Sequence, residues 1–370
     1  MKLIFIKKNF SVHGGAENYM KTLIGSLKGS ADVHVMAKSW AETEGITFHK
    51  INSLSLGSFI SLLSFNSNVC RELKNISADC AVSFERTTCQ DIYRAGEGCH
   101  REWLRLRDMI EPFWKRYTFM INPLHIALLR IEKQLFSDTK IIIANSNMVK
   151  SQIMRHYKVP EERIRIIYNG VDLKRFSPEN AGMHRAKIRQ GLSISEGTKL
   201  ILFVGSGFER KGLAALIKSV SLLDENAMLL VIGKGNIKKF SSIAKKYGIN
   251  DKVLFLGPQK EIERFYASAD IFALPTIYDP FSNATLEAMA SGLPVITTKN
   301  NGVSELIKDG EEGFAVEDPL DHNILSEKIE LALADCKAMG LKARLRAEKF
   351  PIEKAAEEFL KIIQTTPAPP

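Results

Sequence analysis

The sequence predicts an α/β protein of two domains, each built on a parallel β-sheet covered by helices. Three observations lead to this prediction. The chain has 370 residues, which is enough for two domains of ordinary size. Short apolar runs typical of buried parallel strands recur through both halves. In the second half these runs alternate regularly with amphipathic helical segments, a pattern that favours a parallel sheet with right-handed crossovers.

The individual elements follow from the apolar runs and from local start signals. In the first half, the expected strands are 2–6, 32–37, 47–51, 78–84 and 140–146. Segment 55–74 has helical spacing, and Ser146 is suited to open a helix that runs to about Tyr157. In the second half, the expected strands are 200–205, 228–233, 252–257, 271–275, 294–298 and 313–316. An amphipathic helix over 352–363 is expected to end the fold.

Composition narrows the function classes. The formal net charge of +9 favours polyanionic partners such as nucleotide donors, anionic lipid, lipid-linked glycans or nucleic acid. No run of about twenty apolar residues occurs, so no spanning helix is expected. The opening segment KLIFIKKNF is too short and too soon charged for a secretory signal. The five cysteines are odd in number and lack paired zinc spacing, which predicts reduced thiols in the cytoplasm and no metal site.

The stretch from Ile277 to Ser304 has the pattern of a ligand site. Ser282 is a good N-cap, and Phe281 before it and Leu286 after it have the spacing of a hydrophobic staple. The helix start would offer backbone amides to an anion, most naturally a phosphate. Those amides belong to Asn283, Ala284 and Thr285. Two carboxylates, Asp279 and Glu287, bracket the helix start and could turn toward the same ligand. The alternative is an ordinary capped helix with both acids solvated.

A basic pair follows the first strand of the second half. Arg210 and Lys211 precede Gly212 and the next helix, near the strand ends where α/β sheets bind ligands. The forked guanidinium and the compact ammonium together suit a diphosphate. The alternative is a charged surface turn.

The acid-x7-Glu spacing of Asp279 and Glu287, with GLPVI at 292–296 and NGVSE at 301–305, resembles the signature of retaining glycosyltransferases of the GT-B architecture, family four. In that family the second acid binds the ribose of the nucleotide and the first reaches the transferred sugar. Most members carry Glu at the first position, where this chain has Asp279. The Arg-Lys-Gly sequence at 210–212 resembles the subgroup that glucosylates lipopolysaccharide core.

The resemblance also implies the domain plan. It predicts two Rossmann-like parallel-sheet domains that face each other across a cleft, with the C-terminal helix crossing back to the first. The acceptor-side domain would comprise 1–168 with 351–364, and the donor-binding domain 169–350. Such enzymes retain anomeric configuration without a covalent intermediate. The sequence has no Asp-x-Asp pair, which favours metal-independent stabilisation of the leaving diphosphate, and no cofactor is expected beyond the donor itself.

The first half contributes weaker motifs. Gly14 and Gly15, with Glu17 following, match the family's N-terminal donor loop and would let backbone approach a phosphate. His13 beside them is either a surface histidine or a participant in catalysis. Glu97 falls in the region that contacts the acceptor in the family, and it could hydrogen-bond or deprotonate the incoming hydroxyl. A surface glutamate in a turn is the alternative.

Segment 101–136 is aromatic, basic and helical in spacing, with expected breaks at Pro112 and Pro123. An apolar stripe follows from the spacing of Trp103, Leu106, Ile110, Phe113, Tyr117 and Ile121. A surface of tryptophan and arginine suits an anionic membrane interface. Its membrane-facing members would be Trp103, Arg105, Trp114 and Arg116. Alternatively the stripe packs inside the first domain, and both can hold for different faces.

The family resemblance, together with these observations, implies a retaining hexosyltransferase that moves glucose or a similar hexose from a UDP-sugar to a lipid-linked or lipopolysaccharide-type acceptor. We expect it in the cytoplasm, peripheral on the inner face of the membrane. Two alternatives remain at this point: a UDP-sugar epimerase of similar fold, and a basic nucleic-acid-binding protein. The latter would need basic residues interleaved with exposed aromatics on one face, and the sequence offers no such module.

Overall fold

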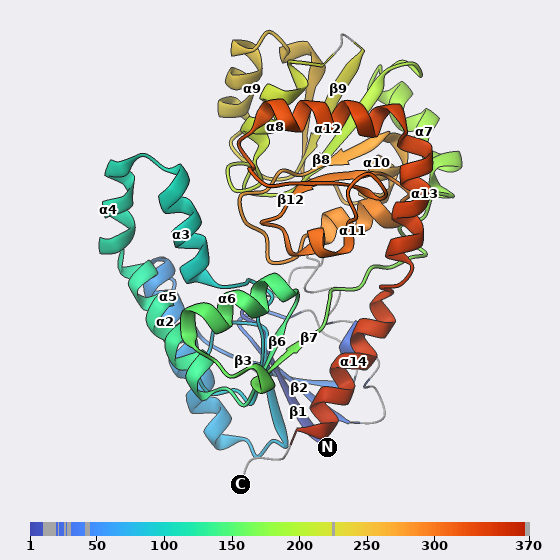
Figure 1. The fold of residues 1–370 in the computed structure, drawn as a ribbon. Coiled ribbons are helices and arrows are strands. Elements are labelled where there is room, and N and C mark those ends of the chain that lie inside the picture. The colour runs from blue at the N-terminus through green and yellow to red at the C-terminus, as the bar shows by residue number, and fades with distance from the viewer. Residues whose placement is uncertain are drawn as a thin grey trace. The chain divides into compact units, whose positions relative to one another are not determined.

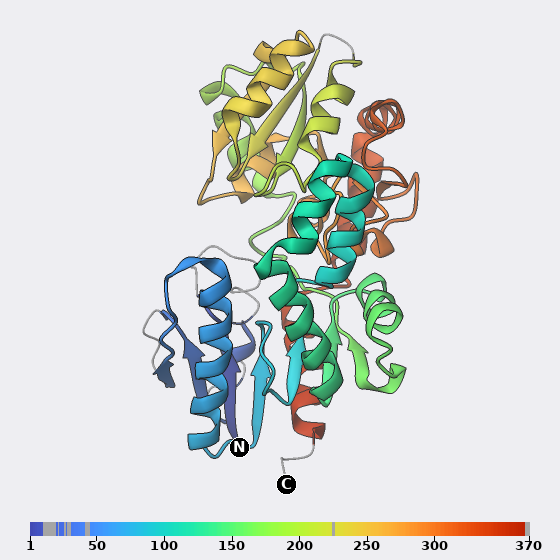
Figure 2. The same cartoon turned by 90° about the vertical axis from the view of Figure 1, so that its left-hand side faces the viewer.

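The structure of the chain is a computed structural model that describes residues 1–9, 20, 22–25, 27, 31–40, 45–223 and 226–366, without the side chains of Phe113, Arg116 and Met120. It divides into two compact units. The first comprises Met1–Asn169 and Glu353–Pro370, and the second Gly170–Ile352. Each unit carries its own parallel sheet with helices packed against it (Figures 1 and 2).

The first unit is built on a seven-stranded sheet of order β3-β2-β1-β4-β5-β6-β7, in which every pairing is parallel. Its strands are β1 (Lys2–Ile6), β2 (Asp32–Ala37), β3 (Ile46–Lys50), β4 (Cys80–Ser83), β5 (Ile92–Arg94), β6 (Ile141–Ala144) and β7 (Ile164–Ile166). Its helices among the described residues are α2 (Gly57–Asn75), α3 (His100–Ile110), α4 (Phe113–Ile121), α5 (Pro123–Asp138), α6 (Asn147–Tyr157) and α14 (Ile352–Thr365), with a 3₁₀ turn at Glu161–Arg163.

The second unit is built on a six-stranded parallel sheet of order β10-β9-β8-β11-β12-β13. Its strands are β8 (Lys199–Val204), β9 (Ala227–Ile232), β10 (Val253–Gly257), β11 (Ile271–Ala273), β12 (Val295–Thr298) and β13 (Gly313–Val316). Its helices are α7 (Asn180–Gly191), α8 (Leu213–Val220), α9 (Ile237–Lys246), α10 (Glu263–Ser268), α11 (Asn283–Ala290), α12 (His322–Ala334) and α13 (Cys336–Ala347), with 3₁₀ turns at Asn250–Lys252 and Gly302–Leu306.

The predicted fold class is confirmed, because both sheets are parallel and covered by helices. The apolar runs that predicted strands form the two cores. Leu3 to Ile6 of β1 and Leu200 to Phe203 of β8 are fully buried. Strands that are buried on both faces carry unbroken apolar sequence, which is why these runs could be recognised.

The last helix, α14, belongs to the first unit although the chain reaches it from the second. Phe359 of α14 stacks on Phe84, which follows β4, with ring centroids 5.9 Å apart and an interplanar angle of 15°. Ala356 and Phe359 are fully buried. The helix predicted at 352–363 therefore forms, and its apolar face completes the core of the first unit.

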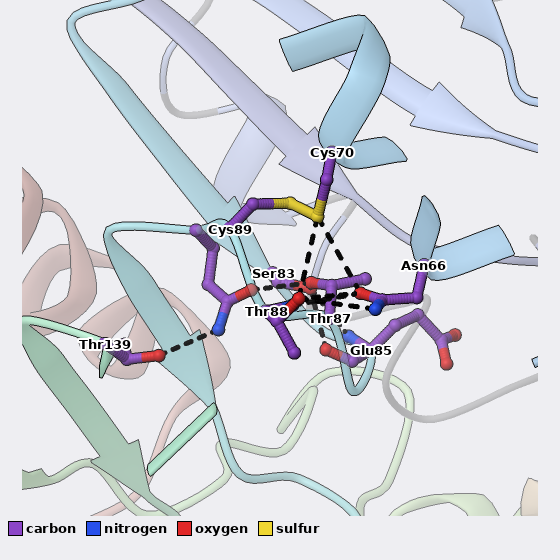
Figure 3. Close-up of a disulfide and its surroundings, with 9 residues drawn as sticks. Asn66, Cys70, Ser83, Glu85, Thr87, Thr88, Cys89 and Thr139 are labelled. Carbon is purple, nitrogen blue, oxygen red and sulfur yellow. Dashed lines mark hydrogen bonds between the residues drawn. A yellow bond between two sulfur atoms is a disulfide. The ribbon is translucent and has the colours of Figure 1, made fainter. Parts of the chain in front are cut away.

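Cys70 of α2 and Cys89 of the loop after β4 form a disulfide (Figure 3). The expectation that all five cysteines are reduced is therefore wrong for this pair, whereas Cys80, Cys99 and Cys336 are not in disulfides. The same loop is joined to α2 by Asn66, whose Oδ1 accepts from the amide of Thr88 at 3.0 Å. The number of cysteines could not predict this disulfide, because Cys70 and Cys89 are brought together only when α2 packs on the sheet.

Candidate functional site

The order of strands changes direction between β8 and β11 in the second unit. β8 is followed in the chain by β9 on one side, and its other neighbour in the sheet is β11. In open α/β sheets this switch point leaves a crevice at the carboxyl ends of the strands, where ligands bind. The loop after β8 carries Arg210 and Lys211, and the loop after β11 carries Asp279. The fold therefore brings together two motifs that lie about seventy residues apart in the sequence.

The two loops are joined by an ion pair between Lys211 Nζ and Asp279 Oδ2. Its side chains are only 11% and 9% exposed. Burial lowers the pKa of the Lys211 ammonium, although the Asp279 carboxylate opposes this effect. Neither residue is the freely solvated side chain that the alternative interpretation required.

Backbone contacts fix the loops further. Arg210 Nη1 donates to the carbonyl oxygen of Tyr278 at 2.8 Å, and the amide of Ile277 donates to the carbonyl oxygen of Arg210 at 2.9 Å. Gly212, at φ +75°, lies so close that a Cβ atom built on it would be 1.8 Å from the carbonyl oxygen of Pro275. Glycine is required here both by the backbone conformation and by the approach of the two loops.

Helix α11 begins as the sequence predicts. Ser282 is its N-cap, and its hydroxyl accepts from the amide of Thr285 at 3.3 Å. The amide of Ser282 in turn donates to Asn301 Oδ1 at 3.1 Å, while Asn301 Nδ2 donates to Thr297 Oγ1 at 2.9 Å. Fully buried Asn301 thereby anchors the start of α11 to the end of β12.

The polar groups at the start of α11 are not equally available to an anion. The amide of Thr285 is already bonded to the cap, so it is not open to a ligand as the sequence suggested. Among the described residues, the buried Oγ1 of Thr285 has no hydrogen-bond partner. Buried Phe281 and Leu286 flank the cap at the spacing expected for a staple. The first turn therefore keeps one unpaired hydroxyl group, on Thr285, together with the partial positive charge of a helix start.

Glu287 lies one turn further along α11 and contacts Tyr266 of α10. The Tyr266 hydroxyl lies 3.0 Å from both Glu287 Oε2 and the carbonyl oxygen of Ala284. Burial raises the pKa of the Glu287 carboxyl, and the hydrogen bond from Tyr266 only partly offsets this. The Glu287 carboxylate is thus held in place by Tyr266, although burial removes part of its hydration.

The raised pKa of Glu287 predicts a pH-dependent difference in stability between the wild type and Glu287→Gln. A carboxyl whose pKa is raised in the folded state binds more protons folded than unfolded, so stability falls as the pH rises from the ordinary value of 4.5 through the raised one. Glu287→Gln lacks this loss, and it should gain stability relative to the wild type as the pH rises from 4 to 7. Urea unfolding at several pH values measures the difference. A relative gain by the wild type instead would show that the fold favours the carboxylate.

In the first unit, Glu97 forms an ion pair with Arg86, which also donates from Nε to Glu132 Oε1 at 3.0 Å. Burial disfavours the charge of Arg86, but Glu97 and Glu132 together hold its pKa above the ordinary value. The side chain of Glu97 remains 52% exposed, so it is neither buried nor a free surface carboxylate. His13, Gly14, Gly15 and Glu17 lie outside the described residues.

The aromatic segment forms three helices, with breaks at Pro112 and at Asn122 before Pro123, as predicted. The expected stripe divides between two faces: Leu106 is buried, while Tyr117 and Ile121 are 69% and 75% exposed. Trp114 is exposed, Trp103 is half-buried, and Arg105 is ion-paired with Glu102. The side chain of Arg116 lies outside the described part of the chain.

No helix within the described residues is both long and apolar enough to cross a membrane. In the same residues, no cluster of three or more His, Cys, Asp or Glu side chains is arranged to hold a metal ion.

Both units match known family models. The model described as glycosyltransferase family 4 matches residues 13–175, and the model described as glycosyl transferases group 1 matches residues 184–348. The crystal structure of WaaG, a glycosyltransferase involved in lipopolysaccharide biosynthesis, has the same fold, with a TM-score of 0.85 over 98% of this chain and 100% of that chain at 24% identity. The chain belongs to the GT-B glycosyltransferases.

Other relatives of this GT-B glycosyltransferase differ in the share of each chain that the alignment covers. Lipopolysaccharide glucosyltransferase WaaG of Escherichia coli is 28% identical over 72% of this chain and 71% of its own length. The uncharacterized glycosyltransferase MJ1607 of Methanocaldococcus jannaschii is 31% identical over 47% of this chain, which spans about half (46%) of that relative's length. Anabaena Alr3699/HepE, solved with UDP and glucose, shares the fold with a TM-score of 0.76 over 99% of this chain and 100% of that chain, at 17% identity.

Two residues of this GT-B site were missed in the sequence. Tyr266 was not singled out, although a buried tyrosine usually directs its hydroxyl to a polar partner. Asn301 was noted only as part of NGVSE, yet its side chain holds the cap of α11. The signal for Asn301 was its place in the turn that follows a buried strand, where asparagine commonly bonds to the backbone.

Proposed function

We propose that this glycosyltransferase moves a hexose from a UDP-sugar to a hydroxyl group of a lipid-linked or lipopolysaccharide-type glycan. The hexose that we propose is glucose. The transfer would retain the anomeric configuration and need no metal ion. The observation that carries the proposal is the meeting of the Arg210–Lys211 loop with the Asp279 loop and the start of α11, at the switch point of the second sheet.

The charge at this site suits a departing diphosphate. Transfer builds negative charge on the leaving nucleotide while the sugar becomes cation-like, so fixed positive groups near the phosphates stabilise the transition state. A guanidinium has five N–H donors and an ammonium three. Arg210 uses one donor on the Tyr278 carbonyl and Lys211 one on Asp279, which leaves donors on both for phosphate oxygens. The partial positive charge at the start of α11 adds to theirs.

The carboxylates would hold the rest of the donor. We assign Glu287, steadied by Tyr266, to the ribose hydroxyls and Asp279 to hydroxyls of the transferred sugar. Because Asp279 is joined to Lys211, sugar and diphosphate would be positioned by one connected pair. Glu97 in the first unit, with the Gly14-Gly15 loop, is proposed for the acceptor hydroxyl and the distal phosphate.

The comparisons support the choice of donor and acceptor class. Alr3699/HepE, which shares the fold, was crystallised with UDP-glucose. WaaG of E. coli is named a lipopolysaccharide glucosyltransferase, and another relative, from Campylobacter jejuni, acts on a diphospho-undecaprenol-linked glycan by its name. These names favour a UDP-hexose and a membrane-anchored glycan acceptor.

The test is donor turnover by purified protein and two variants. We expect UDP release from UDP-glucose in the wild type, and losses of about 10²–10³-fold in Lys211→Ala, because one leaving-group contact is removed. Glu287→Ala should weaken donor binding. Unchanged turnover in both variants would remove the assignment of the site. Conversion of UDP-glucose alone to an epimer, with no UDP released, would favour the epimerase alternative.

We further propose that the protein works at the inner face of the cytoplasmic membrane through exposed apolar side chains of α3 and α4. Met109, Trp114, Tyr117 and Ile121 are each more than 60% exposed. Replacing Trp114, Tyr117 and Ile121 together by serine should reduce binding to vesicles of anionic lipid at least about 10-fold, since each apolar side chain inserted contributes about 1.5–3 kcal/mol.

A matched control for vesicle binding is Leu341→Ser with Leu345→Ser in α13 of the second unit, where the two leucines are 63% and 54% exposed. Co-sedimentation with vesicles compares the three proteins. Equal losses in both variants, or none in the α4 variant, would move the membrane contact away from α4.

A further inference from the structure

A cavity of about 700 Å³ lies on the first unit between α5 and α6. The two helices pack against each other, as Figure 1 shows. The volume is within the range of pockets that bind small molecules. Phe136 and Val159 line the cavity and come shortly before the starts of β6 and β7 in the chain. The part of the cavity that they line therefore lies at the amino edge of the sheet, opposite to the edge where α/β sheets usually bind substrates.

The lining is strongly cationic. Four exposed basic side chains contribute to it, namely Arg101, Arg130, Lys133 and Lys158. No carboxylate of the described residues lines the cavity. Within the described part of the chain, none of the four forms an ion pair. Uncompensated cations around a concave surface attract anions and raise their local concentration.

Two acidic residues beside the lining cations in the sequence, Glu132 and Glu102, are engaged elsewhere. Glu132 of α5 is fully buried and accepts from Arg86, from the backbone amide of His100 and from the Tyr157 hydroxyl at 2.6 Å. Glu102 of α3 accepts from Arg105, Arg155 and His156, the last two at 2.6 Å. These two carboxylates are thus neutralised by other partners. Glu161 is paired with Lys150, and the exposed Asp138 and Glu162 are not among the residues that line the cavity. The lining itself therefore keeps its positive charge.

One wall of the cavity is apolar. Ile126 and Leu129 of α5 face it together with Val159 and Pro160. Arg163, which also lines the cavity, is fixed by bonds from Nη2 to the carbonyl oxygens of Phe136 and Ser137, at 3.1 and 2.9 Å. A purely polar anion would leave the apolar wall uncovered, and a purely apolar molecule would desolvate the cations without pairing them.

We propose that this cavity binds a phosphate-bearing amphiphile. Its phosphate contacts Arg130, Lys133 and Lys158, and its apolar portion covers Ile126 and Leu129. The forked donors of arginine match phosphate oxygens, and several cations together compensate its charge. The site is separate from the donor site of the second unit, so its occupancy does not depend on the transferase assignment. The same chemistry is offered by a lipid headgroup with its acyl chain and, in part, by free phosphate.

Calorimetric titration of the full chain separates these sources. The probes are inorganic phosphate, dihexanoyl phosphatidylglycerol below its critical micelle concentration, and the zwitterionic dihexanoyl phosphatidylcholine at the same concentration. We expect phosphatidylglycerol to bind at least about 10-fold more tightly than either of the others, because only it satisfies both the cations and the apolar wall.

The test variant is Arg130→Glu with Lys133→Glu, and its control is Lys245→Glu with Lys246→Glu, an equal change of charge on exposed residues of α9 in the second unit. The first should weaken the binding of phosphatidylglycerol at least about 10-fold, since hydrogen bonds to charged groups are lost. The control should leave it unchanged. Leu129→Ser should weaken phosphatidylglycerol while leaving any phosphate binding as it was.

Three results would overturn the proposal. Equal weakening in the α5 and α9 variants would show only a response to net charge. Phosphate binding as tight as phosphatidylglycerol would remove the apolar portion of the ligand. Absence of binding by all three probes to the wild type would remove the site. Thermal unfolding of each variant verifies that it is folded, and Lys133→Gln provides a milder substitution with the same expected direction.

Discussion

Replacing Lys211 by methionine is expected to destabilise the protein by about 3–5 kcal/mol, because it leaves Asp279 buried without its partner. The side chains of this pair are almost inaccessible to water, so the carboxylate cannot recover its solvation when the ammonium is removed. The same substitution removes a cation from the proposed diphosphate site, and turnover of the donor should fall by about 10²–10³-fold.

A double variant separates the loss of stability from the loss of activity. Buried ion pairs can often be replaced by apolar residues of similar volume without loss of stability. Lys211→Met with Asp279→Leu should therefore unfold near the wild-type denaturant concentration, while its turnover stays as low as that of the single variant. Guanidinium unfolding and UDP release measure the two properties. If the double variant recovered activity together with stability, the pair would be structural, and the leaving group would be stabilised elsewhere.

The local chemistry of the site could be predicted from the sequence because it lies in short segments. Three signals can be recognised in a few residues each. They are Ser282 before an apolar helix, the basic pair before Gly212 that follows a buried strand, and the spacing of eight residues between Asp279 and Glu287. The ion pair between Lys211 and Asp279 cannot be recognised in this way, because it joins two loops through the order of strands in the sheet. The residues around Lys211 in the sequence do not indicate that β8 and β11 are neighbours in the sheet.

Two strands of the first unit also could not be predicted from local sequence. β5 (Ile92–Arg94) and β7 (Ile164–Ile166) have three residues each and include charged side chains, so neither stands out as an apolar run. β5 forms because its neighbours β4 and β6 supply hydrogen bonds on both edges. Arg94 is buried within it although an isolated arginine predicts exposure. Tertiary context decides such short strands, as it decides the Cys70–Cys89 disulfide.

The approach of the two site loops leads to the second prediction, for Gly212→Ala. Gly212 has φ +75°, and its added Cβ would overlap the carbonyl oxygen of Pro275 at 1.8 Å. Relief of this overlap requires the loop after β8 to move away from the loop after β11, which separates Lys211 from Asp279. We expect a loss of about 1–2 kcal/mol for the backbone conformation and about 1–3 kcal/mol more for the overlap. Donor turnover should fall with it.

Gly207 in the same loop is the matched control, since it has φ +76° and open space around its added Cβ. Gly207→Ala should therefore show the conformational cost alone and keep most of the turnover. Unfolding in guanidinium and UDP release by both variants measure the difference between the two positions. That difference isolates contact between the loops from backbone strain. Equal effects at both glycines would mean that the close approach of the loops is unimportant, and that the site tolerates the displacement of Lys211 from Asp279.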